Sequence, residues 1–118
     1  MFREEGVAGE PEGSSVPSVM LHIVNKSPYE RNSLTSCLAH AGKGGALILI
    51  EDAVYAATRG NVAESAIRRA LEDLPVYALA PDLEARGMQG SVIDGVKVVD
   101  FGGFVDLVAE HRTNQSWL

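Results

Sequence analysis

The single cysteine of this 118-residue chain, Cys37 in the stretch NSLTSCLAH, is the side chain best suited to covalent chemistry. A thiolate is a nucleophile and can accept sulfur, and His40, three residues further along the same helix, could stabilise it. Leu34, Leu38 and Ala41, however, recur at helical spacing and trace an apolar stripe that includes position 37. That position also lies about two turns inside the expected helix, beyond the turn where the helix dipole acts. The sequence therefore leaves two roles open for Cys37, that of a reactive thiol and that of a buried core residue.

An acidic pair, Glu51 and Asp52, lies at the end of the apolar run ALILIE. Open α/β sheets bind ligands at the carboxyl ends of their strands, and two carboxylates there can hold Mg²⁺ in the manner of a phosphoacceptor domain. Too few residues follow Asp52 for a domain of that kind. We therefore favour Asp52 as a helix N-cap beside a solvated Glu51.

The sequence has no other motif for phosphate, metal or hydrolytic chemistry. The glycines and Lys43 of HAGKGG precede a strand, whereas a phosphate-binding loop follows a strand and opens a helix. The histidines at 22, 40 and 111 are dispersed, and no C-x-x-C, H-E-x-x-H or G-x-S-x-G motif occurs. We expect neither a metal nor an organic cofactor.

The composition indicates one acidic globular domain. Hydrophobic residues make up 46% of the chain, charged residues 22%, and the formal net charge is −6. This balance lacks the basic surface that binds nucleic acids or anionic membranes. A lone cysteine cannot form an internal disulfide, and no apolar run approaches the roughly 20 residues of a membrane span. We therefore expect a cytoplasmic protein.

The first 19 residues differ from the rest of the chain. They hold four glutamates and one arginine among glycine, proline and serine, with few large apolar side chains. This composition predicts a disordered acidic leader over residues 1–19, followed by one α/β domain over residues 20–118. Whether the leader is a genuine tail, a misassigned start or a cloning remnant stays open.

From Met20 onward, short apolar runs alternate with segments of helical period, which is typical of β-α units on a mostly parallel sheet. The first helix should follow Ser27 as N-cap and Pro28 at its first position. The continuous apolar run 46–51 should be the central strand. We expect four to five strands flanked by helices: strands at 20–24, 46–51, 75–80, 95–100 and 116–118, and helices at 29–41, 61–74, 81–87 and 101–111.

Four stretches in this order resemble the DsrH/TusB family: MLHIVNKSPYERNSL, LILIEDAVYAA, VYALAPDLEARG and VVDFGGFVDLVAEHRTNQSWL. The resemblance extends from Met20 to Leu118. It implies a DsrE-like, flavodoxin-like α/β fold and the smallest type of subunit in the cytoplasmic DsrEFH and TusBCD sulfur-relay complexes. Such a subunit joins DsrE/TusD-type and DsrF/TusC-type subunits in a dimer of heterotrimers, a heterohexamer, which passes sulfur to an acceptor of the DsrC/TusE type.

The resemblance also bears on Cys37. The Tus branch carries persulfide sulfur toward the 2-thiouridine of the tRNA wobble position, and the Dsr branch serves dissimilatory sulfur oxidation. The principal acceptor cysteine belongs to the DsrE/TusD-type subunit, but Dsr-type relatives of this chain have a cysteine in the first helix, which Cys37 matches. The match favours Cys37 as a candidate persulfide carrier, and the Dsr branch over the Tus branch. No independent turnover is expected of this subunit.

Two alternatives stay open beside the carrier. One is a non-catalytic scaffold that only completes the heterohexamer. The other is a small Mg²⁺-dependent enzyme or phosphoacceptor that uses the acidic pair. In a relay complex the domain should keep an apolar patch for its partners, for which Phe101, Phe104 and Trp117 are the candidates.

Overall fold

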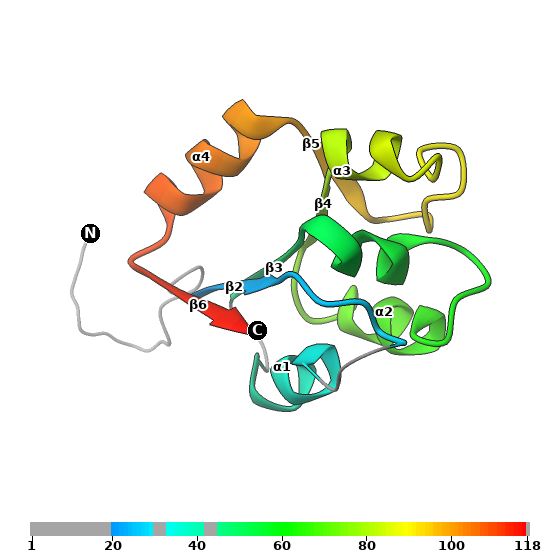
Figure 1. The fold of residues 1–118 in the computed structure, drawn as a ribbon. Helices are drawn as coiled ribbons and strands as arrows, with labels where there is room; N and C mark the ends of the chain where they lie inside the picture. The colour runs from blue at the N-terminus through cyan, green and yellow to red at the C-terminus, as the bar shows by residue number, and fades with distance from the viewer. Residues whose placement is uncertain (1–19, 30–32, 42–44, 118) are drawn as a thin grey trace.

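The computed structural model describes residues 20–29, 33–41 and 45–117, so the predicted leader lies outside the described residues. These residues form a five-stranded sheet in the order β5-β4-β3-β2-β6, in which every pair of neighbours is parallel (Figure 1). The predicted α/β fold with a parallel sheet of four to five strands is therefore confirmed. The strands are β2 (Met20–Val24), β3 (Ala46–Leu49), β4 (Val76–Leu79), β5 (Lys97–Val99) and β6 (Thr113–Trp117).

The central strand is β3, as its sequence predicts. All four of its residues are buried, because helices cover both faces of the sheet at this position. Its side chains alternate between two cores. Leu47 and Leu49 belong to the larger apolar cluster, and Ala46 and Ile48 belong to a smaller cluster on the opposite face.

The connections explain why the two faces are covered unequally. From β2 to β5 the chain moves in one direction across the sheet, so right-handed crossovers place their helices on one face. After β5 the chain returns to β6, beyond β2, and its helix α4 (Phe101–Glu110) covers the other face. Figure 1 shows α4 well apart from the remaining helical elements, α1 (Ser33–Ala41), the 3₁₀ helix η1 (Glu51–Ala57), α2 (Glu64–Ala70) and α3 (Ala80–Ala85).

Several element boundaries differ from the sequence prediction. The described part of the first helix begins at Ser33, since 30–32 lie outside the described residues. Ser27, the predicted N-cap, accepts a hydrogen bond on its Oγ from the Tyr29 N–H at 3.1 Å. Of the helix expected over 61–74, only the part Glu64–Ala70, which is α2, is a regular α-helix. The helix α3 ends close to Gly87, whose φ of 66° is a left-handed conformation that favours glycine, as expected.

The last strand is longer than predicted. It starts at Thr113 rather than at residue 116, and its first four residues are exposed polar side chains, TNQS. Because neither face of this edge strand is covered there, its sequence lacks the alternating pattern by which a strand is recognised. In the part of the chain that the structure describes, no helix is long and apolar enough to cross a membrane.

Candidate functional site

Cys37 lies on the side of α1 that faces the sheet. Its side chain has an exposed fraction of 0%, and it belongs to the larger apolar cluster together with Val24, Leu49 and Ile67. Burial in these surroundings raises the pKa of the Cys37 thiol to about 12. The apolar stripe predicted from Leu34 and its neighbours is therefore a core stripe, and the thiol within it is held in the protonated, less nucleophilic form near neutral pH.

The structure gives His40 other partners than the Cys37 thiol. The His40 ring is exposed, and its Nδ1 donates a hydrogen bond to the carbonyl oxygen of Ser36 at 2.8 Å. The ring also packs against Trp117 of β6, with 5.5 Å between the ring centroids. The predicted support of a thiolate by His40 therefore has no basis in this arrangement.

A cluster around Trp117 was not foreseen from the sequence. The Trp117 Nε1–H donates a hydrogen bond to Nδ1 of the buried His22 at 3.2 Å. Because an indole N–H can only donate, this His22 nitrogen carries no proton, and burial lowers the pKa of His22 as well. The cluster fastens β6 to β2 across 95 positions of sequence, so only the strand order could have revealed it.

The acidic pair at the end of β3 takes part in hydrogen bonds within the chain. Asp52 Oδ1 accepts two hydrogen bonds from Arg86, from Nε at 3.0 Å and from Nη2 at 2.8 Å. The predicted N-cap role of Asp52 is wrong, because Ile50 precedes η1 and Asp52 lies in its first turn. Glu51 has a φ of 51°, and its backbone N–H donates to Asp82 at 2.6 Å. These contacts tie η1 to α3.

No metal site is apparent among residues 20–29, 33–41 and 45–117, where no three histidine, cysteine or acidic side chains come together to hold an ion. The glycine-rich stretch is only partly visible, since 42–44 lie outside the described residues. At Gly45 the backbone explains the glycine, because an added Cβ would lie 2.7 Å from the Met20 carbonyl oxygen. Gly45 therefore allows β3 to start close beside β2.

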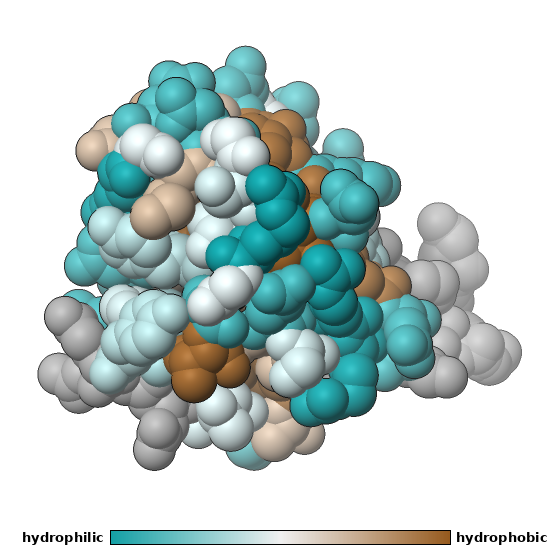
Figure 2. Space-filling view, turned by 90° about the vertical axis from the view of Figure 1, so that its right-hand side faces the viewer, coloured by the Kyte–Doolittle hydropathy of each residue, from teal (hydrophilic) through white to brown (hydrophobic). Residues whose placement is uncertain are grey.

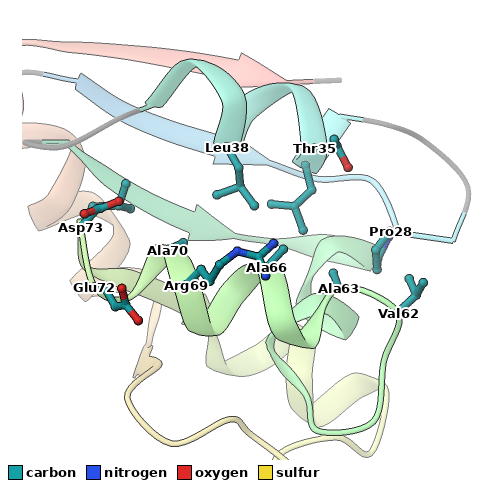
Figure 3. Close-up of a pocket in the computed structure, with 12 residues that line it drawn as sticks. Pro28, Thr35, Leu38, Val62, Ala63, Ala66, Arg69, Ala70, Glu72 and Asp73 are labelled. Carbon is teal, nitrogen blue, oxygen red and sulfur yellow. The ribbon is translucent and has the colours of Figure 1, made fainter.

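A groove of about 550 Å³ lies between α1 and α2. Figure 3 shows Leu38 pointing from α1 toward α2, where Ala66 and Arg69 line the opposite side of the groove. Polar and apolar atoms contribute almost equally to the lining, and its charged side chains are Arg69 on α2 and Glu72 and Asp73 after the end of α2. Cys37 does not line this groove, so the groove gives no route to its thiol.

The predicted partner patch is not contiguous. Phe101 is exposed on α4, whereas Phe104 turns inward against the smaller cluster. Trp117 packs against the larger cluster, on the opposite face of the sheet. Val105 and Val108 are exposed on α4 as well, at the helical spacing i+4 and i+7 from Phe101, and that spacing could have identified them.

The side of the molecule that Figure 2 shows has no such row of apolar side chains. Figure 2 looks at the side of the molecule that lies to the right in Figure 1, where η1 and the segment after α3 are located. Hydrophobic groups appear there in separate areas between hydrophilic ones, rather than as one broad patch. This side offers no counterpart to the row of apolar side chains on α4.

Comparison with known proteins identifies the family. Residues 26–114 match the family model described as "DsrH like protein". Protein TusB of Pectobacterium carotovorum is 37% identical over 99 residues, covering 83% of this chain and all of the relative. Protein TusB of Escherichia coli K12 is 34% identical over 98 residues, with the same coverage. The chain belongs to the DsrH/TusB family. These relatives carry the Tus name, whereas the sequence had favoured the Dsr branch.

Solved structures confirm the fold of this DsrH/TusB family member. The YchN protein of E. coli superposes with a TM-score of 0.70 at 20% identity, over 84% of this chain and 98% of that one. A protein of unknown function from Methanobacterium thermoautotrophicum gives 0.68 at 17% identity, over 85% and 98% of the two chains. At these identities the likeness concerns the fold alone.

Proposed function

We propose that this chain is a subunit of a cytoplasmic sulfur-relay complex of the TusBCD or DsrEFH type. The observation that carries the proposal is family membership over residues 26–114, together with relatives named Protein TusB that are matched over their full length. Those names favour the Tus branch, in which the sulfur ends in the 2-thiouridine of tRNA. The partners would be the DsrE/TusD-type and DsrF/TusC-type subunits and, downstream, an acceptor of the DsrC/TusE type.

Within such a complex, two roles differ in what they ask of Cys37. As a carrier, its thiolate would attack the terminal sulfur of a donor persulfide, forming a new S–S bond while the donor leaves as a thiolate. As a scaffold, the chain would only complete the complex. The complete burial of Cys37 and its pKa of about 12 favour the scaffold, because both the thiolate and access to it are disfavoured.

One experiment separates these roles. The chain is co-expressed with the two partner subunits of its own organism, the complex is treated with a persulfide donor, and each subunit is examined by mass spectrometry. A gain of one sulfur atom on Cys37, absent from the Cys37→Ala complex, would support the carrier. We expect instead that the partner's cysteine is loaded and that the Cys37→Ala complex transfers sulfur at the wild-type rate.

The proposal itself has a separate test in the same cells. Deleting the gene should lower the 2-thiouridine content of tRNA, and plasmid copies of the wild type and of Cys37→Ala should both restore it. An unchanged 2-thiouridine content would contradict the Tus branch. Failure of the wild-type chain to co-purify with either partner subunit would contradict the relay complex as a whole.

A further inference from the structure

The helix α4 has two apolar faces. Its inner face, with Phe104 and Leu107, packs against the sheet in the smaller cluster. A second row is formed by Phe101, Val105 and Val108, whose exposed fractions are 60%, 64% and 37%. A helix on the surface of a monomer normally carries polar side chains away from the core. The second row therefore has the composition of a face that is covered by something else.

The sheet below α4 also has less cover than the opposite face. Four helical elements lie on the other side, whereas α4 is alone on this side among the described residues (Figure 1). Ile23, Tyr77 and Val99 are consequently only partly buried on this side of the sheet. The apolar area of this side is thus larger than the row on α4 alone.

The charges on α4 indicate what kind of surface would cover it. The helix and its N-cap hold Asp100, Asp106 and Glu110 and no lysine or arginine. Among the described residues, Asp106 and Glu110 have no ion-pair partner. If α4 packed against its own copy about a two-fold axis at Val105, Asp100 of each chain would lie opposite Glu110 of the other. Like charges placed opposite one another disfavour that arrangement.

We propose that the outer face of α4, with Phe101, Val105 and Val108, is the docking surface for a different protein chain, which presents an apolar groove bordered by lysine or arginine. The inference rests on the proposed function, in which the docking chain is one of the two partner subunits. The apolar row would supply the contact area, and the acidic residues would select a basic border over a second copy of the chain.

The test uses the co-expressed complex and substitutions of matched exposure. Val105→Lys and Val105→Asp both remove the apolar contact, but only the lysine adds a charge that a basic border repels. Val62→Lys is the control, since Val62 is 68% exposed and lies before α2, on the other face of the sheet. Circular dichroism and the melting temperature of each isolated variant show whether it folds.

We expect the affinity for the partner subunits to fall at least about tenfold in Val105→Asp and further in Val105→Lys. Val62→Lys should bind as the wild type does. Wild-type affinity in both Val105 variants, or equal losses in Val62→Lys, would overturn the proposal. The proposal would also be overturned if Val105→Asp bound the partner subunits more weakly than Val105→Lys. A homodimer of the wild-type chain that the Val105 substitutions dissociate would overturn it as well. Absence of any wild-type complex would instead contradict the proposed function.

Discussion

Cys37 has the spacing of a core residue and the chemistry of a nucleophile, and its surroundings decide between the two. The helical recurrence of Leu34, Leu38 and Ala41 correctly predicted an apolar stripe. What spacing cannot show is depth, because the cover over Cys37 comes from residues such as Val24 and Leu49 on separate strands. The same limit applies to Asp52, whose partner Arg86 is 34 positions away.

Substitution of Cys37 should show its packing role. Cys37→Ala removes one buried atom and should lower the free energy of unfolding by about 1 kcal/mol. Cys37→Ser places a hydroxyl in an apolar cluster and should cost about 1–3 kcal/mol. Urea unfolding at pH 7 measures both. A serine variant as stable as the wild type would show that water reaches position 37, in contrast to its complete burial in the structure.

The raised pKa adds a pH dependence to the same comparison. Above the ordinary thiol value of 9.0, the unfolded chain loses the Cys37 proton while the folded chain keeps it up to about 12. The unfolded state then binds fewer protons, so the stability contributed by Cys37 falls as the pH rises through this window. The difference in the free energy of unfolding between the wild type and Cys37→Ala should therefore narrow between pH 9 and pH 10.5 and stay constant from pH 6 to pH 8.

At the scale of elements, α4 is the segment whose existence was predicted well and whose placement was not. Its sequence, FGGFVDLVAE, predicted a helix at the observed position. Which side of the sheet it covers depends on the return of the chain from β5 to β6, a feature of the strand order. The short polar strand β6 was largely missed for a related reason, since pairing with β2 and not apolar alternation defines it.

The start of α4 depends on one side chain. Asp100 Oδ1 accepts a hydrogen bond from the Gly103 N–H at 2.8 Å and so caps the helix. Asp100→Ala should lower the free energy of unfolding by about 1 kcal/mol, which thermal or urea unfolding measures. Asp106→Ala removes the same charge from the exposed middle of α4 and should change the stability by less than about 0.5 kcal/mol. Equal effects of the two substitutions would contradict the capping role.

At the scale of the whole molecule, the alternation of strands and helices was enough to predict a parallel α/β sheet, and the family resemblance added its type. The position of β6 beside β2 determined how the C-terminal part of the chain is arranged. It brings Trp117 to His22, leaves α4 alone on its side of the sheet, and separates Trp117 from Phe101. The predicted patch failed for that reason, because proximity in sequence near the C-terminus does not mean a shared face.

The pairing of the first described strand with the last also determines how the fold bears mechanical load. Since β2 and β6 run parallel, Met20 and Trp117 lie at opposite ends of one ladder of hydrogen bonds. Tension applied between these two residues shears all the bonds of the ladder at once, whereas tension between Met20 and Arg112 opens them one after another. In single-molecule pulling we expect a clearly higher rupture force for the first attachment than for the second. Equal forces would mean that another part of the fold yields before this pair of strands.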